Sequence, residues 1–363
     1  MKSDEVPEFK RGEKLDLKIC HWSLFAPNQS GLYETVKELV KYENRIEGVL
    51  GGICNPDKPE GGEQDPDGLV TQSHEWAMQD ANLHVIHYRE LPFTDELEPR
   101  MFAVHGTIES CVHSEMSVAQ EAGRSFTSSV ERIRNCDATI TFSNRAQYYW
   151  SQFDPTGKKV FRIHKGIDLE KYTPLGMKEK LSGAPKIGYA EIPREIKYPL
   201  DVFYAVNEYY KLNKKAKFHP IGLSQNWRMW FTFIQQGNFR RLLGEHDMGM
   251  NMKYPAHWYR AFDMLISPVQ QGEPSRCFTE SMACGCPTIT WDSDPFPDDT
   301  YAFRKAKYCD PLDLASKIGD LWEEIKADPV GIRERARKVA EEHYSAERMA
   351  QEFVKVARQT INR

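Results

Sequence analysis

The sequence lacks any long hydrophobic run. No stretch of the 363 residues approaches 18 consecutive apolar residues, which excludes an ordinary membrane-spanning helix. Residues 1–18 are charged throughout and contain no apolar segment of the signal-peptide type, so we expect no secretory signal. Cysteine is scarce as well: eight in a chain of this length are too few for a disulfide scaffold. We therefore expect reduced thiols and a cytoplasmic protein.

Several signatures of catalysis and metal binding are also missing. The chain has no G-x-S-x-G motif of the nucleophilic hydrolases and no G-x-x-x-x-G-K-[ST] loop, which argues against a kinase or an ATPase. Cys284 and Cys286 are separated by one residue, too close for the usual C-x-x-C zinc pair, and no second pair lies at zinc spacing. The sequence thus predicts no metal site.

The composition indicates a folded protein of about two domains. Hydrophobic residues make up 40% and charged residues 28%, which is ordinary for a globular chain. Residues 1–170 hold 19 Lys and Arg against 28 Asp and Glu, a net charge of −9, whereas residues 171–363 have a net charge of +4. A basic half suits a ligand that carries phosphate, and an acidic half is a poor surface for nucleic acid.

Short apolar runs alternate with helical stretches along the chain, which is typical of parallel α/β units. The predicted strands are 15–20, 46–50, 83–87, 101–104, 137–142, 186–190, 216–221, 264–266 and 288–291. A break rich in Pro and Gly at 174–184 divides them into two sets, and residues 51–69 are predicted to form a long surface loop. We predict two doubly wound domains, each with a ligand crevice at the carboxyl ends of its strands.

The strongest functional signal is the segment 272–287, GEPSRCFTESMACGCP. It is predicted to contain a loop with Glu273 and a helix that opens near Glu280. The N–H groups at the start of such a helix can hold a diphosphate, and a carboxylate nearby can accept hydrogen bonds from ligand hydroxyls. An acidic residue in a first turn is equally typical of a simple helix cap, and these residues alone leave both interpretations open.

The stretch E-S-M-A-C-G-C-P from Glu280 resembles the E-A-M-A-C-G-x-P segment of family 4 nucleotide-sugar glycosyltransferases. Further segments resemble the same family in the same order: 137–143, 163–174, 259–268, 310–311 and 344–347. The resemblance implies a GT-B architecture, in which two Rossmann-like doubly wound domains face each other across a cleft. It divides the chain into an acceptor-side domain at 1–172, a nucleotide-sugar-binding domain at 173–344 and a C-terminal helix at 345–363 that crosses back to the first domain.

The resemblance also implies roles in donor binding. Glu280 would hold the ribose hydroxyls, and Glu273 would hold hydroxyls of the donor sugar at the reacting centre. Glu273 lies seven positions before Glu280, where the family has its acidic residue eight positions before. Arg276 stands where the family usually has an apolar residue, and we assign it to the donor site. The family's usual Arg is absent after Gly188, and Arg194 and Lys197 would replace the cations that grip the diphosphate; a solvated loop face is the alternative for both.

Two residues of the first half belong to the predicted site. His105 follows a predicted strand, and family members place a His near this point, close to the reacting sugar; a strand-end His bonded to backbone is the alternative. Gly31 lies in the first loop between strand and helix, where a glycine lets backbone approach a diphosphate closely. His105 and Glu273 are thus the predicted catalytic residues.

The resemblance predicts a retaining glycosyltransferase that needs neither a metal nor a cofactor. Its partners would be a nucleotide-sugar donor and an acceptor glycan or small molecule. One alternative is a viral type of enzyme that modifies a hydroxymethylated base in DNA, which the aromatic and Arg-rich segment 226–241 favours and the acidic first half disfavours. Another is a two-domain protein that binds a nucleotide sugar without transferring it.

Overall fold

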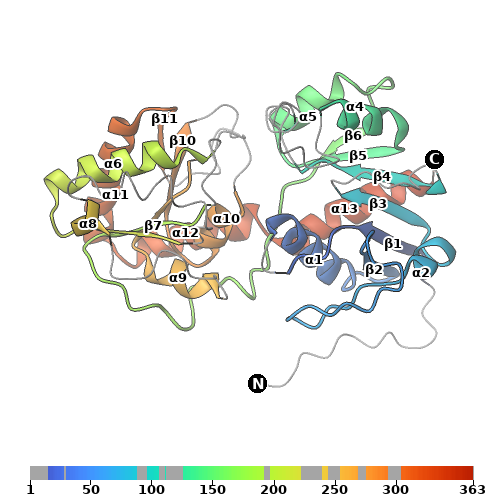
Figure 1. Ribbon diagram of the computed structural model, residues 1–363, viewed down its shortest axis with the longest axis horizontal. Helices are drawn as coiled ribbons and strands as arrows, with labels where there is room; N and C mark the ends of the chain where they lie inside the picture. Colours follow the sequence, from blue (N-terminus) through green and yellow to red (C-terminus); the bar gives the residue numbers. More distant parts are fainter. Residues whose placement is uncertain are drawn as a thin grey trace.

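The computed structural model places the chain in two α/β domains that lie side by side (Figure 1). The structure describes residues 15–27, 30–87, 96–105, 111, 126–191, 197–221, 239–243, 254–268, 275–292 and 304–362. None of the helices within these ranges has the length and apolar character that crossing a membrane requires.

The first domain is built on a six-stranded parallel sheet with the strand order β2-β1-β3-β4-β5-β6. Its strands are β1 (Leu17–Trp22), β2 (Val49–Cys54), β3 (Leu83–His87), β4 (Arg100–Ala103), β5 (Ala138–Thr141) and β6 (Val160–Arg162). Its helices are α1 (Gly31–Glu43), α2 (His74–Gln79), α4 (Phe126–Asn135) and α5 (Asn144–Ser151). Apolar side chains on the central strands are buried on both faces, as helix-covered parallel sheets require.

The second domain repeats this plan with five parallel strands in the order β11-β10-β9-β7-β8. Its strands are β7 (Lys186–Tyr189), β8 (Lys217–Pro220), β9 (Met264–Ile266), β10 (Thr288–Asp292) and β11 (Arg304–Lys307). Its helices are α6 (Pro199–Leu212), α8 (Phe239–Leu242), α9 (Pro255–Ala261), α10 (Arg276–Ala283), α11 (Pro311–Ala327) and α12 (Gly331–His343). The predicted pair of doubly wound domains is therefore confirmed.

The last helix, α13 (Ala346–Ile361), returns to the first domain. Met349 and Phe353 are fully buried in the same core cluster as Ile19 of β1. In Figure 1 α13, drawn in red, lies beside the blue strands of the first domain, although α12 belongs to the second. Glycine is required where the chain crosses, because a Cβ on Gly166 would lie 2.4 Å from the backbone oxygen of Ser345. The predicted boundaries at 172 and 344 remain predictions.

Some elements differ from those predicted. The predicted loop at 51–69 begins as strand, because Gly51 and Gly52 belong to β2. Both positions need glycine for packing rather than for a turn: a Cβ on Gly51 would lie 2.4 Å from Oε2 of Glu43, and one on Gly52 would lie 2.9 Å from the Trp76 ring. The strands β6 and β11 were not predicted. β11 is the edge strand Arg304–Lys307, whose sequence RKAK has the charge typical of an exposed edge rather than the apolar run of a central strand.

Candidate nucleotide-sugar site

Polar side chains meet at the carboxyl edge of the second sheet. Glu191 follows β7 and is buried, and its Oε1 accepts a hydrogen bond of 2.6 Å from the hydroxyl of Ser267, which follows β9. The Ser267 hydroxyl also lies 2.8 Å from that of Ser275 at the start of α10. Lys197 Nζ lies 3.0 Å from the other oxygen of Glu191. Burial raises the pKa of Glu191, but Lys197 and the two hydroxyls outweigh burial and hold that pKa below its ordinary value. This edge therefore holds an ionised carboxylate and a cation in contact.

Helix α10 begins four residues before the position predicted for it. Its first residue is Arg276, and the hydroxyl of Ser275 caps it by accepting from the backbone N–H of Phe278 at 3.2 Å. Glu280 thus lies in the second turn, with its side chain buried. The prediction that the helix opens near Glu280 is wrong, because Ser275 takes the capping role that an acidic residue in the first turn would have shared. The alternative in which Glu280 merely caps its helix is excluded with it.

Arg276 joins the two domains at this point. Its two terminal nitrogens donate to both carboxylate oxygens of Glu38 on α1, at 2.8 and 2.6 Å. Its Nε lies 2.6 Å from Oε1 of Glu280, one turn further along α10. The Arg276 side chain is only 14% exposed, and those of Glu38 and Glu280 are 3% and 6% exposed. One guanidinium therefore bridges a carboxylate from each domain in surroundings nearly free of water, where charge-assisted hydrogen bonds are strong.

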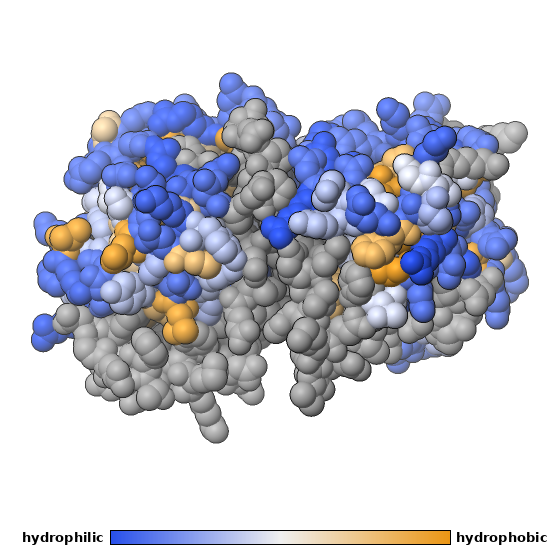
Figure 2. All heavy atoms as spheres, turned by 90° about the horizontal axis from the view of Figure 1, so that it is seen from above, coloured by the Kyte–Doolittle hydropathy of each residue, from blue (hydrophilic) through white to orange (hydrophobic). Residues whose placement is uncertain are grey.

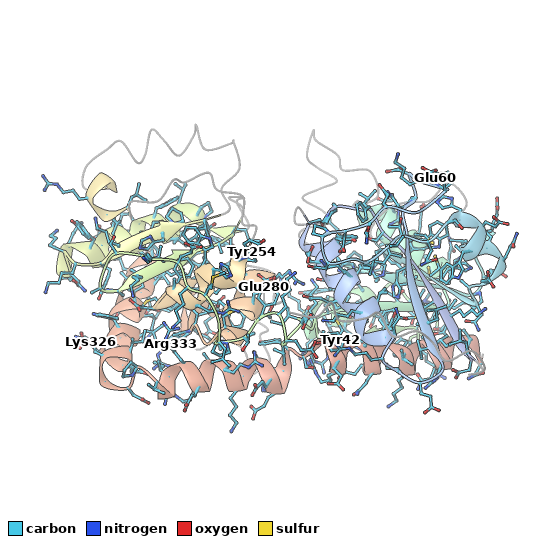
Figure 3. All side chains as sticks on the ribbon, turned by 90° about the horizontal axis from the view of Figure 1, so that it is seen from below. Tyr42, Glu60, Tyr254, Glu280, Lys326 and Arg333 are labelled. Atoms are coloured by element: carbon cyan, nitrogen blue, oxygen red, sulfur yellow. The ribbon has the colours of Figure 1, made fainter. Side chains whose placement is uncertain are left out.

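The surroundings of Glu280 favour hydrogen bonding with a ligand. Burial raises the pKa of Glu280, and the adjacent Arg276 opposes that rise. Tyr259 of α9 is fully buried, and its hydroxyl and that of Tyr172 also act to lower the pKa of Glu280. Seen from below, Glu280 lies on the side of the second domain that faces the first, and Tyr42 lies on the opposing side (Figure 3). A buried carboxylate close to the domain boundary is suited to accepting hydrogen bonds from hydroxyl groups.

Gly31 is brought to the same place from the first domain. It is the first residue of α1, whose cap is the hydroxyl of Ser30. An added Cβ at Gly31 would lie 3.7 Å from Cδ of Arg276, an ordinary contact distance. Gly31, Arg276 and Glu280 were predicted for one site, and the structure brings them close together. Gly31 and Glu280 are almost 250 residues apart in the sequence.

His105 lies two residues after β4 at the carboxyl edge of the first sheet. Its Nε2 is 2.8 Å from Nδ1 of His87, and its ring packs on Phe142 with a centroid distance of 4.7 Å. Within the described part of the chain His105 is thus bonded to a side chain, that of His87, rather than to backbone. Burial lowers the pKa of His105, and the charge of Lys165 lowers it further, so the imidazole is neutral near pH 7.

Two predicted site residues, Glu273 and Arg194, lie outside the described residues, as do residues 226–238 of the aromatic and Arg-rich segment 226–241. Lys197 is described and contacts Glu191, an acidic partner that was not predicted. Glu38 and His87 were not predicted either. Glu191 directly follows a predicted strand and His87 ends one, so position at a strand end was a signal for both. Glu38 carried no signal, because an acidic residue inside an amphipathic helix is ordinary.

The surface and the thiols add little to the site. All eight cysteines are free, and no group of three or more His, Cys, Asp or Glu within the described ranges is arranged to hold a metal ion. Seen from above, the coloured part of the surface is mainly hydrophilic, with hydrophobic residues in small separate groups (Figure 2). The charged cluster around Arg276 thus remains the main candidate site.

Acidification is expected to destabilise the protein through buried neutral histidines. Burial lowers the pKa of His84 on β3 to about 4, whereas the unfolded chain has the ordinary value of about 6.5. The unfolded state therefore binds the proton first, so this stability is complete above pH 6.5 and is lost as pH falls toward 4. Between pH 7 and pH 5, His84 alone should lower the free energy of unfolding by about 2 kcal/mol. Urea titrations of the wild type and of His84→Gln should differ by that amount in their pH dependence; equal dependence would contradict the assignment.

The fold is that of known nucleotide-sugar enzymes. No model of a known protein family matches the chain, and no curated protein matches it by sequence. Among solved structures it is similar to sucrose-phosphate synthase from Thermosynechococcus elongatus, with a TM-score of 0.68, 15% identity and coverage of 95% of this chain and 99% of that one. It is also similar to Anabaena HepE in complex with UDP-glucose (TM-score 0.66, 11% identity, 94% and 100% covered). A third is the catalytic domain of starch synthase IV from Arabidopsis thaliana bound to ADP and acarbose (TM-score 0.66, 14% identity, 96% of this chain and 99% of that one covered). The two domains thus have the GT-B fold of glycosyltransferases.

Proposed function

We propose that the chain is a retaining glycosyltransferase that moves a sugar from a nucleotide-sugar donor to an acceptor hydroxyl. The observation that carries this proposal is the buried Glu280 carboxylate at the domain boundary, on the helix that begins at the carboxyl edge of the second sheet. Ligands of open α/β sheets bind at such edges. Similarity to structures with UDP-glucose or ADP bound supports a donor of the same chemical class.

In this proposal Glu280 accepts hydrogen bonds from the ribose hydroxyls and the start of α10 faces the diphosphate. Because Arg276 already occupies the Glu280 carboxylate, the ribose hydroxyls compete with its guanidinium for that group. Lys197, released from Glu191, would pair with the diphosphate, and Arg194 and Glu273 would complete the donor site. Gly31 would let the start of α1 approach the donor from the other side.

The transfer itself would need positioning and charge stabilisation rather than a protein nucleophile. The bond from the sugar C1 to the phosphate oxygen breaks, with its electron pair leaving on the nucleoside diphosphate. The acceptor oxygen bonds to C1 on the same face, and its proton passes to the leaving phosphate. Cations fixed beside the diphosphate would stabilise the charge that it gains, and His105 would lie next to the reacting sugar.

Donor binding is tested by thermal stabilisation with UDP, ADP and their glucose conjugates. A ligand present at 100 times its Kd adds about 2.7 kcal/mol to the stability, which corresponds to a rise in Tm of about 3 to 4 °C in a chain of this size. Uridine and adenosine are the matched controls, because they lack the diphosphate and should give a much smaller shift. If no nucleotide or nucleotide sugar raises Tm at millimolar concentration, the donor assignment is wrong.

Transfer separates an enzyme from a protein that only binds. Release of UDP or ADP from the stabilising nucleotide sugar is expected, slowly to water and faster with a suitable acceptor. The anomeric configuration of the product, read by NMR, tests retention. Binding without any release would favour the non-catalytic alternative.

A further inference from the structure

Four side chains of the first domain form one continuous chain of hydrogen bonds that ends at His105. Oε2 of Glu43 lies 2.9 Å from Nε2 of His21, whose Nδ1 lies 2.9 Å from Nε2 of His87. Nδ1 of His87 lies 2.8 Å from Nε2 of His105. Glu43 and His21 are fully buried and His87 is 2% exposed, whereas His105 is partly exposed. The chain therefore runs from the domain interior to the carboxyl edge of the sheet.

The fold makes specific room for this chain. His21, His87 and His105 come from β1, β3 and the end of β4, which are adjacent in the sheet. Glu43 ends α1, and its carboxylate occupies the space that a side chain on Gly51 would fill. Apolar rings cover the imidazoles: Phe353 lies 5.5 Å from the His21 ring, and Phe142 covers His105.

With all three imidazoles neutral, proton counting allows this chain two arrangements. A neutral imidazole has one N–H donor and one acceptor nitrogen, and an ionised carboxylate only accepts. With Glu43 ionised, His21 must donate through Nε2, which leaves its Nδ1 to accept from His87, and His87 in turn accepts from Nε2–H of His105. The free Nδ1 of His105 is then an acceptor. In the reverse arrangement Glu43 is protonated, every bond is inverted, and Nδ1 of His105 carries a hydrogen.

We propose that Glu43, acting through His21 and His87, fixes the proton of His105 on Nε2 and so presents its Nδ1 as a hydrogen-bond acceptor for a hydroxyl of the substrate. This inference rests on the proposed function for the identity of that hydroxyl, which belongs to the sugar. Glu43, His21 and His87 are positioning residues, because none of them reaches the surface where a substrate would bind. Among the described residues Nδ1 of His105 has no hydrogen-bond partner, as a nitrogen kept for a ligand requires.

The charges around the chain are compatible with this arrangement. Glu43 is its one carboxylate, and its Oε1 has no hydrogen-bond partner among the described residues. Lys165 lies beyond Phe142, with Nζ 5.0 Å from the ring centroid, and its charge disfavours a second cation at His105. Burial lowers the pKa of His87 as well, with His105 and His21 adding to the effect, so the imidazole of His87 stays neutral.

The proton positions are tested directly by NMR of protein with 15N-labelled histidines, with or without substrate. In the wild type at pH 7, long-range 1H–15N correlations should show His105, His87 and His21 protonated on Nε2 only. In Glu43→Gln the amide can donate or accept, so a mixture of tautomers at His105 is expected. A wild-type His105 protonated on Nδ1 would overturn the proposal, as would an unchanged tautomer in Glu43→Gln.

Kinetics give the functional readout. Glu43→Gln should lower kcat about 10- to 100-fold with little change in the donor KM, by analogy with the loss of a partner that orients a metal-binding histidine. Glu341→Gln, which removes the charge of an exposed carboxylate paired with Arg337 on α12, is the control and should leave kcat unchanged. His21→Gln breaks another link and should mix the tautomers of His105 if Glu43→Gln does not fold. A drop in Tm with kcat and tautomer unchanged would make the chain merely structural and would overturn the proposal.

Nucleotide affinity measured on the same samples separates the two claims. A wild type that binds no nucleotide contradicts the proposed function, while the tautomer pattern still tests the orientation of His105 by itself.

Discussion

Replacing Glu280 by glutamine is expected to weaken the affinity for a nucleoside diphosphate about 30-fold and to leave the fold intact. The amide has nearly the same shape and keeps an acceptor oxygen for Arg276, so α10 retains its packing. It loses the charge, and hydrogen bonds to a charged group are stronger than neutral ones by about 1 kcal/mol each. Two ribose hydroxyls on Glu280 therefore correspond to about 2 kcal/mol, or about 30-fold in Kd. Calorimetric titration with UDP and ADP measures this change.

Glu38→Gln is the matched control for Glu280→Gln. Both variants remove one carboxylate from the same guanidinium, and both wild-type carboxylates are almost completely buried. Glu38 belongs to α1 and has no assigned contact with the nucleotide, so its variant should lose stability with little loss of nucleotide affinity. Equal losses of nucleotide affinity in the two variants would mean that the loss comes from the disturbed Arg276, and would contradict the role of Glu280.

The sequence predicted the repeated parallel α/β plan because its signal is local. Short runs of three to six residues, mostly apolar, mark the central strands, and each is buried on both sides in the structure. The signal failed where a strand is exposed or packs through glycine. Lys305 and Lys307 of β11 lie at an edge. Gly51 of β2 is typical of a turn in the sequence, because only the structure shows that the Glu43 carboxylate occupies the space beside it.

The sequence predicted those residues of the candidate site that belong to a recognisable local motif. Glu280 lies in a motif, whereas Glu38 is one of several acidic residues on α1. Glu38 contacts Arg276 only because the second domain places Arg276 beside it. The histidine chain could not be predicted from the sequence for the same reason. His21 and His87 are 66 residues apart, and the order of the strands brings them together.

His105→Ala is expected to lower kcat about 100-fold and to leave nucleotide affinity within a factor of two, the opposite pattern to Glu280→Gln. His105 lies in the first domain, and the nucleotide is assigned to the second, so its loss should not change the Kd for UDP or ADP. A group that hydrogen-bonds the reacting sugar acts mainly in the transition state, and losing such a group costs about two orders of magnitude in rate. His74→Ala is the control, since this histidine of α2 bonds the backbone oxygen of Asn55 at 2.9 Å and has no assigned role. Steady-state rates with saturating donor measure kcat. If His105→Ala keeps the wild-type rate, the carboxyl edge of the first sheet does not hold the reacting sugar, and the histidine chain that ends there has no catalytic purpose.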